Sequence, residues 1–131
     1  MERDLGDILD RQSIAKLKAE RIGLDENIRE YEAFSNRVPA HYDFDVEMFF
    51  KLILKLNGFI WDLESALKSG KDNLKEPHYL FSSNNDPQLI QIGIISILIR
   101  NINSVRVDVK NIINNLAREG FTDVKKDHIS E

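Results

Sequence analysis

Charged side chains occur in this sequence at positions where an amphipathic helix would carry apolar ones. Near the C-terminus, one row with heptad spacing reads Ile92, Ile99, Arg106 and Ile113, so a guanidinium group takes the place of one isoleucine. A buried guanidinium is costly unless a carboxylate or another anion pairs with it. The sequence therefore predicts that Arg106 meets an acidic side chain or a bound anion inside the protein.

The N-terminal segment supplies carboxylates for this pairing. Asp7 and Asp10 are three residues apart, so they would share one face of a helix. Both align with apolar residues of that segment, as does Arg21, and we therefore expect an internal polar network. Its candidate members come from three segments and are Asp7, Asp10, Ser13, Arg21, Asn57, Glu64, Asn103, Arg106 and Lys110.

Three interpretations of this network stay open at the level of sequence. Buried ion pairs and asparagines can fix the register and the choice of partner in helical bundles, which would make the network structural. The same groups could form a ligand site for an anion or a metal, with Mg²⁺ on Asp7, Asp10 and Glu64 and a phosphate beside Arg106 and Lys110. In the third interpretation, the helices have a different phase and these side chains face water.

Motifs of known catalytic sites are missing from the sequence. It has no cysteine, and its three histidines, His41, His78 and His128, fall in expected loops or in the tail. A nucleophile and its general base are therefore difficult to assemble. There is also no glycine-rich phosphate loop, no Gly-x-Ser-x-Gly turn and no His-Glu-x-x-His helix. These observations favour a non-enzymatic protein that needs no cofactor, apart from Mg²⁺ if the network is a ligand site.

The composition restricts the class of protein further. A net charge of -4 argues against binding to nucleic acid, which normally requires a basic surface. Uninterrupted apolar runs are only a few residues long and the N-terminus is charged, so we expect no membrane span and no secretion signal. The absence of cysteine is compatible with a reducing compartment, and we expect the protein to be cytoplasmic.

Three long helical patterns must position the candidate residues, and no strand pattern accompanies them. The helices are predicted at about residues 4–34, 44–69 and 87–119, within one domain over 1–120 that is followed by a polar tail at 121–131. A kink is expected at Gly23, and Gly70 is expected to end the second helix in a left-handed conformation. The predicted fold is all-α, an antiparallel bundle of three helices.

The second and third predicted helices carry more apolar residues than one contact face requires. Heptad rows run from Val46 to Leu67 and from Ile95 to Leu116, as in a coiled coil. The additional apolar residues outside these rows include Phe50, Phe59, Trp61, Ile92, Ile94, Ile97 and Ile99. Because three helices cannot cover this surface, we expect a homodimer that forms a larger bundle. Alternatively, the loop over residues 71–86 covers it.

Three segments resemble a family of small, all-helical bacterial proteins, in the same order along the chain. The first begins with an acidic residue followed by Asp-Arg-x-Ser-Ile and ends in Lys-x-Glu-Arg-Ile, within residues 7–22. The matching residues of the other two segments are Asn57, Trp61 and Glu64, and then Asn103, Arg106, Lys110 and Asn114. Members of the family occur near glycosyltransferase and polysaccharide genes. The resemblance implies an accessory role in glycan assembly in the cytoplasm, in which we expect a protein partner. The family has no established activity that could be transferred to this chain.

A second resemblance is to the all-α nucleotide pyrophosphatases of the MazG-like class, in which helix carboxylates hold magnesium. The pair Asp7-x-x-Asp10 has the spacing of their first acidic motif. The second motif is not matched, because Asp62 and Glu64 are two residues apart and point to different faces of a helix. This resemblance implies an alternative function, the binding or hydrolysis of nucleotides or sugar nucleotides.

Overall fold

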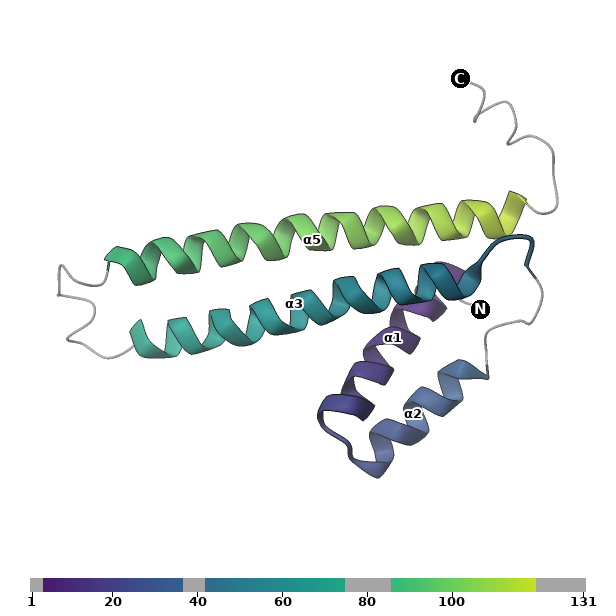
Figure 1. Ribbon diagram of the computed structural model, residues 1–131, viewed down its shortest axis with the longest axis horizontal. Coiled ribbons are helices and arrows are strands. Elements are labelled where there is room, and N and C mark those ends of the chain that lie inside the picture. The colour runs from purple at the N-terminus through teal and green to yellow at the C-terminus, as the bar shows by residue number, and fades with distance from the viewer. Residues whose placement is uncertain (1–3, 37–41, 75–85, 120–131) are drawn as a thin grey trace, which may run out of the picture. The chain divides into compact units, whose positions relative to one another are not determined.

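The computed structural model describes residues 4–36, 42–74 and 86–119, and all regular structure in these ranges is helical. The helices are α1 (Leu5–Arg21), α2 (Asp25–Ser35), α3 (Val46–Leu74) and α5 (Asp86–Glu119) (Figure 1). The all-α prediction is therefore confirmed. The predictions for the three histidines, for residues 75–85 and for the polar tail lie outside the described residues.

The chain divides into two compact units. The first unit contains α1, α2, the beginning of α3 up to Asn57 and the end of α5 from Arg106. The second unit contains the parts of α3 and α5 that lie between Gly58 and Val105. Because both long helices run through both units, this division does not test the single bundle domain predicted for residues 1–120, which stays a prediction.

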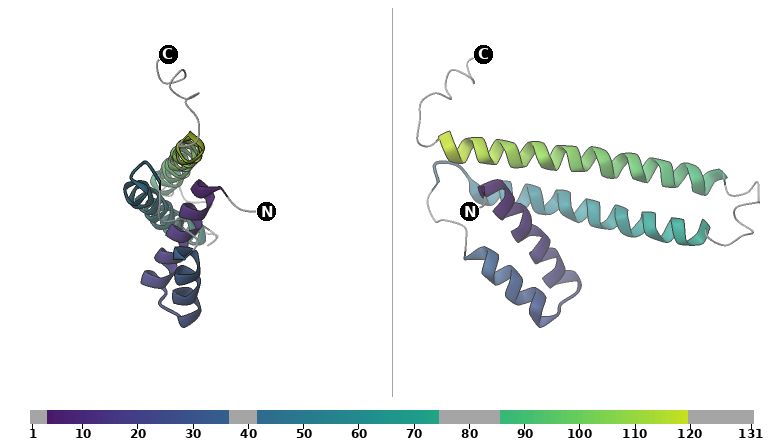
Figure 2. Two further views of the ribbon diagram at one scale, coloured as in Figure 1. Left: turned by 90° about the vertical axis from the view of Figure 1, so that its right-hand side faces the viewer. Right: turned by 180° about the vertical axis from the view of Figure 1, so that it is seen from behind.

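The prediction of one helix over residues 4–34 is wrong, because the chain reverses direction between α1 and α2. Gly23 has a φ of 77°, in the left-handed region that glycine adopts without steric cost. The backbone N–H groups of Ile22 and Gly23 both donate to the carbonyl of Lys18, which ends α1. The chain then returns, so that α1 and α2 pack side by side as a helical hairpin (Figures 1 and 2).

Replacing Gly23 by alanine tests this turn. The new Cβ would have space, since its nearest neighbour is the Ala19 carbonyl oxygen at 3.7 Å. The left-handed backbone is nevertheless strained for alanine, so we expect the free energy of unfolding to fall by about 1 kcal/mol in urea titrations. Gly23→Asn should cost less, because asparagine tolerates this conformation better. Equal stability of the alanine variant and the natural chain would contradict a left-handed residue 23.

The ends of α3 agree with the sequence only in part. The Asp45 carboxylate accepts a hydrogen bond from the Met48 N–H at 3.0 Å, which is the predicted N-cap. At the other end the prediction is wrong, because Gly70 is helical and α3 continues to Leu74. A Cβ at position 70 would lie 3.2 Å from the Cγ1 of Ile92, so the missing side chain allows α3 and α5 to lie close together here.

The hydrophobic core of the first unit is formed by α1, α3 and α5. Its buried members are Leu5, Leu9, Ile53, Val109 and Ile113. Aromatic residues before and within the first turns of α3 pack against it, including Tyr42, Phe44 and Phe49, whose rings contact one another in sequence. The core therefore joins the N-terminal helix to the beginning of α3 and the end of α5.

The inward face of α5 is rotated relative to the heptad row predicted from the sequence. Leu98, Val105 and Ile112 belong to that row and are exposed. Val109 and Ile113 are buried, and Arg106 is only partly accessible. In the first unit α5 packs against α1 as well as α3, so its buried face is broadened toward Arg106 and Lys110. This rotation positions the polar residues discussed next.

Candidate functional site

Six of the nine candidate residues come together in the first unit. Asp7, Asp10 and Ser13 come from α1, Asn57 comes from α3, and Arg106 and Lys110 come from α5. The other three, Arg21, Glu64 and Asn103, are exposed. Arg21 is the last residue of α1, whereas Glu64 and Asn103 belong to the second unit.

Helical spacing explains why these side chains converge. Asp7, Asp10 and Ser13 follow one another at intervals of three residues, which places them along one face of α1. Arg106 and Lys110 are four residues apart on α5 and are neighbours for the same reason. Each helix therefore presents a short polar strip, and the core on either side brings these strips into contact.

Asn57 is the connection between the three helices. Its side-chain nitrogen donates to Asp10 Oδ1 at 2.9 Å and to Ser13 Oγ at 2.6 Å, while its side-chain oxygen accepts from Arg106 Nη1 at 3.2 Å. The residue is only 4% exposed. A buried amide must find partners for both of its groups, and here α1 satisfies the donor and α5 satisfies the acceptor.

Asp10 is the anionic centre of the network, and its side chain is only 7% exposed. Arg106 Nη1 lies 3.5 Å from one carboxylate oxygen, and Lys110 Nζ lies 3.5 Å from the other. Lys110 also lies 3.6 Å from Asp7, which in turn pairs with Arg11 on the surface. Charges of alternating sign thus run from the interior to the solvent, and each carboxylate has cationic neighbours.

The contact between α1 and α5 depends on two residues that the network prediction did not include. The Gly6 N–H donates to the side-chain oxygen of Asn114 at 2.7 Å. A Cβ at Gly6 would lie 2.6 Å from the backbone oxygen of Lys110, so only glycine allows this separation of the helices. The sequence contains two signals for this contact. Gly6 lies inside a predicted helix, where glycine is unusual, and Asn114 is one of the residues that carry the family resemblance.

The charged side chains of the network already have partners within the described part of the chain. Asp7 and Asp10 are already paired with cations, and no group of three or more histidine, cysteine or acidic side chains that could hold a metal occurs among the described residues. One buried donor of the network, Arg106 Nε, has no hydrogen-bond partner in the described part of the chain. The chemistry of this cluster is therefore mainly the mutual neutralisation of groups from three helices.

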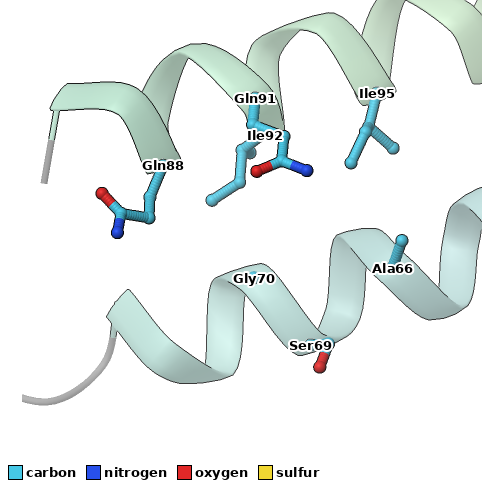
Figure 3. Close-up of a pocket in the computed structure, with 7 residues that line it drawn as sticks. All are labelled: Ala66, Ser69, Gly70, Gln88, Gln91, Ile92 and Ile95. Carbon is cyan, nitrogen blue, oxygen red and sulfur yellow. The ribbon is translucent and has the colours of Figure 1, made fainter.

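A separate groove of about 350 Å³ lies in the second unit between α3 and α5. Its lining residues are Ala66, Ser69, Gly70, Gln88, Gln91, Ile92 and Ile95. Figure 3 shows the longer side chains extending from α5 toward α3, where the facing residues are small. None of the lining residues is charged or a histidine, so the groove offers no general acid or base.

Comparisons with known proteins add no relative from which a function could be transferred. No family model, curated protein or solved structure matches this chain. Both family resemblances noted in the sequence therefore stay predictions. By length and composition alone, α5 from Pro87 to Arg118 would be long and apolar enough to cross a membrane. One helix of this kind is weak evidence, because core helices of soluble proteins can have the same length and composition.

Proposed function

We propose that this chain is a non-enzymatic, helical interaction protein, in which the polar network holds the α1–α2 hairpin in one register against α3 and α5. The observation that carries the proposal is the set of partners around Asp10. Its carboxylate is contacted by an amide from α3 and by two cations from α5, so its charge is compensated by groups of the chain itself.

The network is suited to specifying a register because its members are satisfied only together. Asn57 needs Asp10 and Ser13 on α1 and Arg106 on α5 at the same time. Rotating α1 by one residue turns its side chains by about 100° and would separate these groups. A buried charge or amide without partners is unfavourable, so alternative packings are penalised more than the native one.

The resemblance to the bacterial helical family suggests where such a protein would act. It supports an accessory role in the cytoplasm, close to enzymes of glycan assembly. In such a role the protein contributes binding surfaces, and the chemistry is performed by its partners. The proposal requires no cofactor. The helices act by binding either a second copy of the chain or another protein.

The alternative function, binding or hydrolysis of nucleotides or sugar nucleotides, is favoured by one observation. Arg106 Nε is a buried donor without a partner among the described residues, and the side chains of Arg106 and Lys110 are still 23% and 24% exposed. A phosphate group could approach two cations there. Both cations, however, already contact Asp10, so the phosphate would have to compete with a fixed carboxylate.

A thermal-unfolding screen separates the two functions. Nucleotides, sugar nucleotides and inorganic phosphate are each added at millimolar concentration, with and without Mg²⁺. We expect no increase in the melting temperature, since each charged side chain of the network already contacts an oppositely charged one. A ligand at about 100 times its dissociation constant would stabilise the fold by about 2.7 kcal/mol, which raises the melting temperature by several degrees.

The control for this screen is Arg106→Lys, which keeps the charge but removes the planar, bidentate donor group. One result would overturn the proposed function in favour of nucleotide or sugar-nucleotide binding. It is a melting temperature that one ligand raises in the natural chain but not in Arg106→Lys. An increase in the melting temperature that persists in this variant would mean that the ligand does not need the guanidinium group of Arg106, and the role proposed for the network would stand.

A further inference from the structure

One side of α5 exposes a row of apolar side chains in the second unit. The row consists of Ile90, Ile94, Ile97, Leu98 and Val105, which are between 43% and 63% exposed, and it surrounds Asn101. These six residues are called the α5 stripe. The largest apolar patch on a soluble protein is often a functional binding surface.

The spacing within the α5 stripe is that of a coiled-coil contact. Ile94, Leu98, Asn101 and Val105 follow at intervals of four, three and four residues, which keeps them on one side of the helix. The inward side of α5 in this unit contains Ile95 and is a different face. Ser96, Arg100 and Asn103 are exposed on the side away from the stripe. The helix thus has two apolar faces and one polar face.

The second unit cannot cover the α5 stripe with its own described residues. Among the described residues of this unit, only Gly58 and Ile95 are buried. Phe59 on α3 is exposed as well. Two helices placed side by side bury one face of each, and a second face requires a further helix. Among the residues of this unit that the structure describes, the α5 stripe is therefore left uncovered.

We infer that the α5 stripe binds the α5 stripe of a second copy of this chain. A two-fold contact places the same surface on both partners, so a surface with charges of one sign would repel its own copy. The stripe contains no charged residue, and its one polar member is Asn101, a residue type that sets register and partner number at such contacts. The stripe is therefore complementary to itself. This inference rests on the proposed function and names the partner.

The exposed area agrees with a dimer of moderate affinity. At about 30 Å² for each methyl or methylene group, the half-exposed side chains of the stripe contribute about 300 Å² of apolar area per copy. Interfaces are a little more than half apolar, so the complete contact would bury about 1,000 Å² in total. This value is close to the lower limit for a specific interface, where weak complexes are found, so we expect a dissociation constant on the order of 10 µM.

A membrane is a less suitable partner for the same face. A helix that spans a bilayer is apolar on all sides, whereas α5 carries Ser96, Arg100 and Asn103 away from the stripe. A helix lying on an anionic lipid surface usually has lysine or arginine along its polar face. Between Pro87 and Val105 the only cation is Arg100, so attraction to anionic lipid would be small.

Sedimentation equilibrium of the full chain between 1 and 300 µM tests the inference. We expect a monomer–dimer equilibrium with a dissociation constant of about 10 µM. Leu98→Glu should raise the dissociation constant of the dimer about 100-fold, because the substitution places two carboxylates together in an apolar contact. Ser96→Glu adds the same charge away from the stripe and should have no effect. Asn101→Leu should tighten the dimer about tenfold, because a polar residue at such a position lowers stability.

Cysteine cross-linking gives an independent measurement of the same contact. The chain has no cysteine of its own, so a single introduced thiol reports on one position. Position 98 is close to the middle of the stripe, which runs from Ile90 to Val105, and would lie near the two-fold axis whether the helices are parallel or antiparallel. Leu98→Cys should form a covalent dimer on mild oxidation, and Ser96→Cys should not.

Three outcomes would overturn the inference. They are a monomer at 300 µM, a dimer that Leu98→Glu leaves unchanged, and binding to phosphatidylglycerol vesicles by a chain that does not self-associate. Helical circular dichroism of each variant shows that the fold is retained. The proposed function fails by a different measurement, a ligand-dependent melting temperature that requires Arg106, so the two failures are distinguishable.

Discussion

Replacing Asp10 by alanine is expected to lower the free energy of unfolding by about 3 kcal/mol, one of the two largest effects predicted for a single side chain of this protein. The substitution leaves Asn57 Nδ2 without one of its acceptors and removes the carboxylate that Arg106 and Lys110 share. Both cations retain some contact with solvent, which keeps the loss near the lower end of the range for a broken buried ion pair.

Urea titration followed by circular dichroism measures this effect, and Arg11→Ala is the matched control. Arg11 pairs with Asp7 at 3.3 Å on the surface, where an ion pair contributes less than about 0.5 kcal/mol. A loss for Asp10→Ala as small as that for Arg11→Ala would show that the network is accessible to water. The role in fixing the register of α1 would then be lost.

The sequence was sufficient to place Arg106, Asp10 and Asn57 on facing sides of their helices. Heptad spacing determines the side of a helix on which a residue lies, and that information led from the isoleucine row to Arg106. It does not determine height along the helix. Glu64 lies in the row of Asn57 but seven residues further on, which is about 10 Å along the axis of α3. The heptad pattern places Glu64 in the network by its side of the helix alone, and in the structure its side chain is exposed.

The reversal at Gly23 could not be recognised from periodicity for a related reason. Ile22, Leu24 and Ile28 continue the apolar spacing of the preceding residues, so the pattern reads as an unbroken helix. In the structure these three side chains are exposed at the turn and on α2. A left-handed glycine is a property of one residue, whereas the hydrophobic pattern averages over many. The turn therefore became visible only with the backbone geometry.

The α5 stripe shows the converse case, in which an excess in the sequence pattern carried information. Ile94 and Ile97 were surplus to one heptad row, and in the structure they are exposed together with residues of the row itself, such as Leu98. The buried face of α5 in the first unit is the one toward α1, so part of the predicted heptad row is left exposed beside the surplus isoleucines. The helix uses its Arg106 face within the chain, and the remaining apolar face is available for another molecule.

Replacing Gly6 by alanine is expected to lower the free energy of unfolding by about 2 to 3 kcal/mol, although alanine is the better helix former. The added Cβ would lie 2.6 Å from the Lys110 carbonyl oxygen and 2.8 Å from the Asn114 side-chain oxygen. The first of these atoms belongs to the backbone and cannot rotate away. The two helices must therefore separate, which also lengthens the hydrogen bond from Gly6 to Asn114.

Gly93→Ala is the control that isolates the close contact from helix propensity. A Cβ at Gly93 would meet nothing within 4 Å, so this substitution should raise the free energy of unfolding by about 0.5 to 1 kcal/mol. The two changes are chemically identical and both are within helices, yet their effects should have opposite signs in the same urea titration. If Gly6→Ala were also stabilising, α1 would not pack against α5 at this position. The polar network, which requires that packing, would have no structural basis.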